Sequence, residues 1–274
     1  MTLYDPEQHR SLASLYGQDQ GVSCRSWAAL ALWCLGYPDQ ALQQSHEALT
    51  LAQELAHPFS LAYAMCFAGM FCQLRREVQA AQERATAEIA LCTEQGFALY
   101  LARGTILRGW TLAEQGQGEE GRAQMHQGMA AYQATGSEVF RPYYLAFLAE
   151  AYGKAGQAEE GLTMLAEALT AVHKTGERLY EAELYRLNGE LLMARSAAHH
   201  MEAESCFRQA LDVARCQQAK SWELRAALSL SRLWQQQGEH AKAQDLLAPI
   251  YGWFTEGFDT ADLKEAKALL NELQ

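Results

Sequence analysis

Residues 152–161 read YGKAGQAEEG and are followed by LTMLAEAL. Two glycines, a lysine and an acidic pair fit either a loop that cradles phosphate or a turn between two helices. A phosphate loop has the pattern G-x-x-x-x-G-K-[ST] after a strand. Here Lys154 precedes Gly156, and neither Lys-Ser nor Lys-Thr follows Gly161. The stretch therefore predicts a helix–helix turn, with Gly156 just past the end of a helix.

The same glycine position recurs elsewhere in the chain, as Gly36 in CLGYPD, Gly116 in EQGQGEE and Gly238 in QQGEHA. Composition agrees with a helical chain, because only 5 of the 274 residues are proline, and Val and Ile are scarce beside Ala, Leu, Gln and Glu. That palette favours helices over strands. We therefore predict an all-α protein.

Small residues mark a repeat with a period near 40. The anchors, each early in a helix that follows a turn, are Ala41, Ala80, Gly121, Gly161, Ala203 and Ala243. Small residues also stand twelve positions before the anchors and, in five of six units, seven positions after them, allowing for a two-residue insertion at SAAHH in the fifth unit. Positions seven apart share a helix face, so the pattern predicts close helix–helix packing in every unit.

This pattern resembles the tetratricopeptide repeat, whose units are pairs of antiparallel helices. The resemblance covers about residues 21–254, with a period near 40 rather than 34, which implies longer helices. It predicts an α–α superhelix of six units, at about 21–57, 58–96, 97–136, 137–176, 177–219 and 220–254. Residues 1–20 are expected to form an N-terminal helix, a possible remnant of a preceding repeat. Residues 255–274 are expected to hold an amphipathic C-terminal capping helix.

Several classes of function are disfavoured. A net charge of −11 argues against a large nucleic-acid-binding face, and the longest apolar runs are too short to cross a bilayer. The seven cysteines form no C-x-x-C pair and indicate free thiols in a reducing compartment. No catalytic set, metal-ligand spacing or cofactor motif emerges. We therefore expect a cytoplasmic protein that is not an enzyme and has no cofactor.

The concave groove of such a repeat is the expected binding surface, because the first helices line it. With the resemblance as a guide, the inward positions lie 18, 15, 11 and 8 residues before each anchor, with the same two-residue correction in the fifth unit. The candidate groove residues are Arg103, Trp110, Tyr143, Glu150, Glu183, Arg186, Glu190, Arg225 and Arg232. Arginine and aromatic residues are typical of interface hot spots, and Trp110 is expected at an exposed position. The alternative is that the charged residues pair with one another along and between helices.

Several stretches of the sequence are also similar to the C-terminal repeat region of large bacterial signalling proteins. Those proteins join a class III adenylate/guanylate cyclase domain to an AAA-like or STAND-type ATPase. The matching phrases include LGYPDQAL, LAEAYGKAGQAEEG and LLAPIYGWFTEGFDTADLKEAKALL. This resemblance implies a sensor or regulatory arm that binds a protein or peptide, with linked ATPase or cyclase domains as partners. The alternative is a small-molecule sensor whose groove encloses a ligand.

Overall fold

The computed structural model of the chain describes residues 4–5 and 12–273. Residues 1–3 and 6–11 of the helix predicted over residues 1–20 lie outside the described residues, within which the short α2 spans Leu12–Tyr16. Every regular element in the described ranges is a helix, so the all-α prediction is confirmed.

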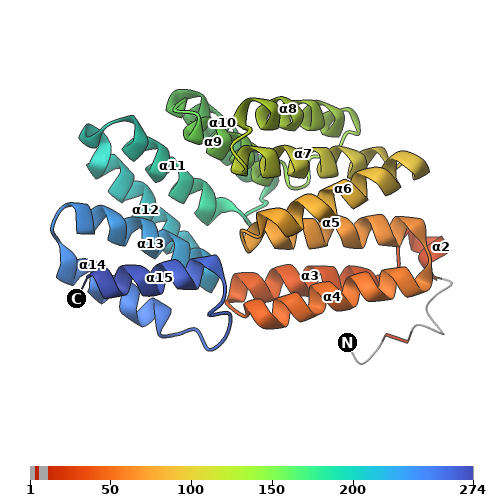
Figure 1. Ribbon diagram of the computed structural model, residues 1–274, viewed down its shortest axis with the longest axis horizontal. Coiled ribbons are helices and arrows are strands. Elements are labelled where there is room, and N and C mark those ends of the chain that lie inside the picture. The colour runs from red at the N-terminus through yellow and green to blue at the C-terminus, as the bar shows by residue number, and fades with distance from the viewer. Residues whose placement is uncertain (1–3, 6–11, 274) are drawn as a thin grey trace. The chain divides into compact units, whose positions relative to one another are not determined.

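The longer helices follow one another in pairs (Figure 1). Their bounds are α3 (Gln20–Leu35), α4 (Pro38–Leu55), α5 (Pro58–Leu74), α6 (Val78–Gln95), α7 (Ala98–Glu114), α8 (Gly118–Ala134), α9 (Arg141–Lys154), α10 (Ala158–Thr175), α11 (Glu181–Arg195), α12 (His200–Cys216), α13 (Lys220–Gln236), α14 (His240–Tyr251) and α15 (Ala261–Glu272). A short 3₁₀ helix, Ala197–His199, occupies the insertion before α12. Pro38 and Pro58 each open a helix, where the missing backbone N–H costs no hydrogen bond.

The described residues form two compact units. One holds the described residues up to 33 together with 38–137, and the other holds residues 34–37 together with 138–273. In the first unit α4, α5, α6, α7 and α8 pack in sequence, and α5 also contacts α7. In the second unit α9 to α14 pack in sequence, α9 contacts α11, and α11 contacts α13. The C-terminal α15 packs on α13 and α14. Within each unit, therefore, the first helices of successive pairs lie against one another.

The two helices of a pair differ in how they are buried. The first helices α5, α9 and α13 are buried around most of their circumference. The second helices α10 and α12 bury a single stripe at helical spacing, for example Ala203, Phe207, Ala210 and Ala214 in α12. Such a stripe is typical of an amphipathic helix with one face in water. The second helices therefore supply most of the exposed surface.

The stretch at 152–161 is a turn between helices, as predicted. The first helix ends at Lys154 and the second begins at Ala158. Gly156 lies between them with φ of 74°, in the left-handed region. The Gln157 N–H donates to the carbonyl of Tyr152 at 2.9 Å and closes the end of α9. The glycine is thus explained by helix termination.

The small residues lie where helices approach closely, with one correction to the repeat register. Ala41, Ala203 and Ala243 are fully buried, but the predicted second anchor, Ala80, is half-exposed. Its neighbour Ala81 has an exposed fraction of 0% and is the structural equivalent. The error arose because two alanines stand side by side, and only one of them faces the first helix. With Ala81 as the anchor, Gly69 and Glu88 take the two flanking positions of the second repeat.

Candidate functional site

The nine predicted groove residues are divided between the two compact units. Arg103 and Trp110 lie on α7 in the first unit. The other seven lie on α9, α11 and α13 in the second unit: Tyr143, Glu150, Glu183, Arg186, Glu190, Arg225 and Arg232. The predicted residues therefore form two separate groups.

In the first unit both predicted residues are buried. The Arg103 guanidinium lies 3.1 Å from the sulfur of Met70 and stacks over the rings of Phe67 and Tyr100, at 5.6 and 5.8 Å from the ring centroids. Trp110 has an exposed fraction of 3%. The expectation that Trp110 is exposed is therefore wrong. The physical reason is that α7 contacts α5, α6 and α8, which leaves little of its circumference open.

The aromatic residue of the second unit, Tyr143, is also buried. Its ring meets that of Tyr180 edge to face at 5.0 Å, and Tyr180 meets Trp222 in the same way at 4.9 Å. This aromatic row joins α9 to the starts of α11 and α13, and edge-to-face pairs stabilise such contacts. Tyr180 and Trp222 were missed from the sequence. The available signal was an aromatic residue 21 positions before four successive anchors, after the insertion correction: Tyr100, Phe140, Tyr180 and Trp222.

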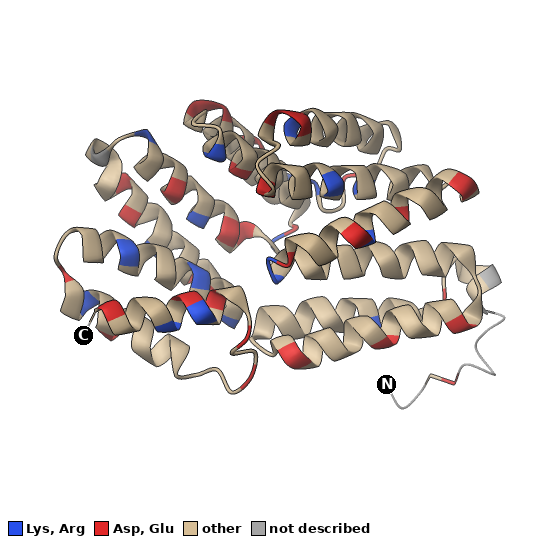
Figure 2. Cartoon of the chain, in the orientation of Figure 1, with Lys and Arg blue, Asp and Glu red and all other residues tan. Residues whose placement is uncertain are grey.

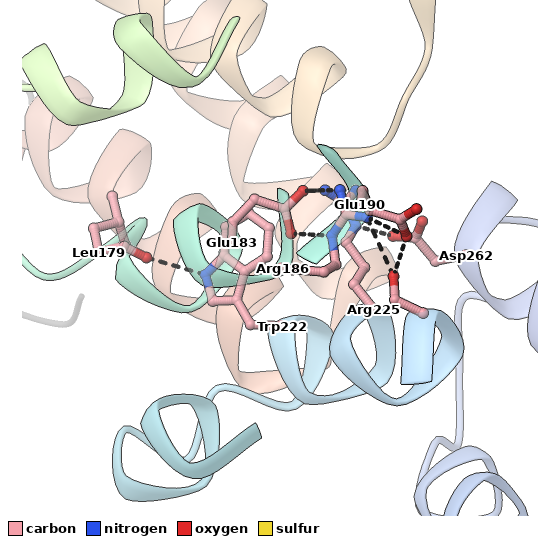
Figure 3. Close-up of polar contacts among 8 residues, drawn as sticks. Leu179, Glu183, Arg186, Glu190, Trp222, Arg225 and Asp262 are labelled. Carbon is pink, nitrogen blue, oxygen red and sulfur yellow. Dashed lines mark hydrogen bonds and ion pairs between the residues drawn. The ribbon is translucent and has the colours of Figure 1, made fainter. Parts of the chain in front are cut away.

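The charged residues of the second unit form a network centred on Arg186 (Figure 3). Its guanidinium donates two hydrogen bonds to the Glu183 carboxylate, at 2.7 and 2.8 Å. It also lies 3.3 Å from an oxygen of Glu190 and 3.3 Å from the hydroxyl of Ser229 on α13. The Ser229 hydroxyl in turn donates to Glu190 at 2.6 Å. Two-point contact between guanidinium and carboxylate fixes both side chains.

Arg225 extends the network to the C-terminal helix. Its Nε donates to Asp262 of α15 at 2.8 Å, and its Nη1 lies 3.5 Å from Glu183 of α11. The guanidinium also lies 5.2 Å from the centroid of the Trp222 ring, whose indole N–H donates to the carbonyl of Leu179 at 3.1 Å. Three helices, α11, α13 and α15, are thus joined through one buried arginine. Asp262 and Ser229 were not predicted, because no spacing rule relates them to the anchors.

The network holds both arginines in the charged state. Burial alone lowers the pKa of Arg186 and Arg225, but the carboxylates beside them raise it by more. For Arg186 the main opposing group is Glu183, with Glu190 and Glu150 adding to it, and for Arg225 it is Asp262. The net pKa of each guanidinium therefore stands above its ordinary value. The stability of this cluster depends on the carboxylates remaining ionised.

A separate pair lies on the same two helices: Arg232 on α13 donates to Glu265 of α15 at 2.9 Å. Basic and acidic residues accordingly lie next to one another on α13 and α15 (Figure 2). Of the two alternatives left open by the sequence, mutual pairing is what the described residues show for five charged residues: Glu183, Arg186, Glu190, Arg225 and Arg232. Binding of a partner by these residues stays a prediction.

Two open depressions of about 660 Å³ each lie elsewhere. The first is lined mainly by α4, and the second by α12 with Arg178 and Glu181. None of the nine predicted groove residues lines either depression.

Within residues 4–5 and 12–273 no cluster of three or more His, Cys, Asp or Glu side chains has metal-binding geometry. No helix in the same ranges has the length and apolar character needed to span a membrane.

The chain is similar to a known repeat family and to solved helical-repeat structures. The family profile described as Tetratricopeptide repeat matches residues 22–47, 102–127, 142–167 and 224–249. A Rap protein, solved in complex with Competence and Sporulation Factor, is similar over 93% of this chain and 88% of its own, with 15% identity and a TM-score of 0.58. No curated protein matches the sequence.

A second similar structure is a Signal Transduction ATPase with Numerous Domains (STAND) protein with a tetratricopeptide repeat sensor, from Pyrococcus horikoshii. The match covers 92% of this chain at 13% identity, with a TM-score of 0.51, and spans 38% of that protein's length. At these identities the likeness shows the fold alone. The family profile and the shared fold lead to one conclusion: the chain carries tetratricopeptide repeats, in a helical-repeat fold like those of Rap and STAND-type sensors.

Proposed function

We propose that the chain is a non-catalytic scaffold that recognises a protein or peptide. The observation that carries this proposal is the tetratricopeptide-repeat fold, whose stacked helix pairs present extended surfaces for partners. The fold of the Rap protein, solved with Competence and Sporulation Factor bound, supports it. In the second unit, ion pairs between α11, α13 and α15 hold these helices together.

The chain further acts, in this proposal, as the regulatory arm of a larger cytoplasmic signalling ATPase or cyclase. The fold likeness to the sensor-bearing STAND protein supports this role, since the matched part makes up 38% of that protein. A partner's binding would then alter the activity of the linked domains.

Arg232 on α13 is the arginine of the predicted groove set that a partner could reach. Arg232 has a side-chain exposure of 46%, whereas Arg225 and Glu183 are buried. Arginine at the edge of a packed surface combines a charged fork with a long apolar stem, and hot spots favour it. The chain offers a matched control in Arg195, which has a side-chain exposure of 45% and pairs with Glu159 of α10.

We expect Arg232→Glu to reduce the amount of partner retained from lysate at least tenfold, because it reverses a charge at the contact surface. Arg195→Glu should retain the partner as wild type does. The measurement is a pull-down with the three proteins, each confirmed as folded by circular dichroism. Equal retention by both variants would place recognition away from α13. If no protein is retained and a metabolite instead raises the melting temperature, the chain is a small-molecule sensor.

A further inference from the structure

The second repeat carries a carboxyl group where the other repeats carry a small or apolar residue. Seven positions after the anchors stand Ala48, Glu88, Gly128, Ala168, Ala210 and Ile250. All six positions are buried, and Glu88 has an exposed fraction of only 1%. Because this slot faces the first helices, a glutamate there places its carboxyl inside the packing between repeats.

The neighbouring helices leave room for this side chain. On α7, Gly104 stands directly against it, and a Cβ atom there would lie 3.3 Å from the Glu88 carboxyl carbon. On α5 the thiol of Cys66 forms a hydrogen bond with the carboxyl group. The remaining oxygen, Oε1, is buried and has no hydrogen-bond partner in the described part of the chain. The site therefore accommodates the volume of a glutamate but leaves its charge poorly solvated.

The nearest positive charge only partly compensates. The Arg103 guanidinium on α7 lowers the pKa of Glu88, but it packs against Met70 and two aromatic rings. Burial is the larger effect and raises the pKa of Glu88 to about 8, against the opposing effects of Arg103 and the Cys66 hydrogen bond. Folding thus favours the neutral carboxylic acid.

The other titratable groups of this cluster do not titrate in the same range. Burial raises the pKa of Cys66 on α5, of Cys92 on α6 and of Tyr100 on α7, so the three stay neutral below pH 8.5. Arg103 carries its charge throughout. Glu88 is therefore the group of the cluster that changes charge between pH 5 and pH 8.5.

We propose that Glu88 is a proton-binding site at the junction of the second and third repeats, and that loss of its proton loosens the packing of α7 against α5 and α6. A neutral acid fits the slot, whereas a carboxylate would place a negative charge in a buried site that offers no hydrogen bond to Oε1. The stability of the first unit would then depend on pH through Glu88.

The direction of the pH effect follows from linkage. The pKa of Glu88 rises on folding from an ordinary 4.5 to about 8. Its contribution to stability is fully present below about pH 4.5 and is lost as pH rises toward 8. Over that interval each pH unit changes the unfolding equilibrium constant about tenfold. Glu88→Gln, which mimics the protonated acid, removes this dependence.

The test compares wild type, Glu88→Gln and Glu94→Gln, an exposed glutamate on the same helix, by urea unfolding at pH 5.5, 6.5 and 7.5. Relative to Glu88→Gln, the unfolding constant of wild type should rise about 70-fold over these two pH units. Glu94→Gln should follow wild type. A wild type and Glu88→Gln that run parallel across the range would overturn the proposal. Should Glu88→Gln not fold, Glu88→Met supplies the comparison, with a side chain of similar length.

A second experiment measures how accessible the packing at this junction is. Cys66 is buried beside Glu88, whereas Cys24 is exposed. At pH 8, N-ethylmaleimide should label Cys66 at least tenfold faster in wild type than in Glu88→Gln, as measured by mass spectrometry of the peptide that contains it. Cys24 should be labelled equally in both proteins. Equal labelling of Cys66 in both would show that ionisation does not open the junction.

Discussion

Replacing Gly121 with alanine should destabilise the first unit by about 3 kcal/mol, because the added methyl group has no space. A Cβ atom at this position would lie 2.5 Å from the carbonyl oxygen of Gly109 and 2.7 Å from the backbone nitrogen of Ala113. Both atoms belong to the backbone of α7, so no rotamer change relieves the contact. The helix itself would have to move away, and the gain of about 1 kcal/mol in helix propensity does not offset that.

The matched control is Gly118→Ala in the same helix. There a Cβ atom would meet only the far end of the Arg122 side chain, at 3.4 Å. We expect its free energy of unfolding to stay within about 0.5 kcal/mol of wild type, or to rise slightly. Urea denaturation followed by circular dichroism measures both variants. If Gly121→Ala matches Gly118→Ala in stability, α7 and α8 are not held at backbone contact.

The close approach at Gly121 shows which part of the fold the sequence predicts well. A residue must be small wherever two helix backbones nearly touch. Small residues therefore recur in the sequence at a fixed spacing. The same reasoning predicts the turn at Gly156, where helix termination needs a left-handed residue. This reasoning fails where two small residues are adjacent, as at Ala80 and Ala81. The sequence does not show which of the two alanines faces the neighbouring helix.

The side-chain environment of the candidate site was harder to predict. Spacing placed Trp110 and Tyr143 on an inward face, but whether that face is open depends on how closely the next first helix packs against it. The partners of Arg225 come from α11 and α15, and the sequence contains no period that links Asp262 to the repeat. Long-range ion pairs are specified by three-dimensional packing, so the sequence suggested mutual pairing without identifying every partner.

The ion pair between Arg225 and Asp262 is buried, and this burial leads to the second large expected effect. Asp262→Ala should lower the free energy of unfolding of the second unit by about 3 kcal/mol, because it leaves a buried guanidinium without its closest carboxylate. The side chains of Arg225 and Asp262 have exposures of 8% and 12%. The remaining carboxylate, Glu183, lies 3.5 Å from Arg225 and already makes two hydrogen bonds with Arg186. Urea denaturation followed by circular dichroism provides the measurement.

The same helix provides the control. Glu265→Ala removes the partner of the more exposed Arg232 and should cost at most about 1 kcal/mol, since water replaces the lost contact. A buried pair also responds differently from an exposed one when both members are removed. The double variant Arg225→Met/Asp262→Ala should recover most of the stability lost in Asp262→Ala, because it no longer buries an uncompensated charge. If Asp262→Ala and Glu265→Ala are equally mild, the Arg225 guanidinium reaches water, and α15 is held to α13 by its apolar residues alone.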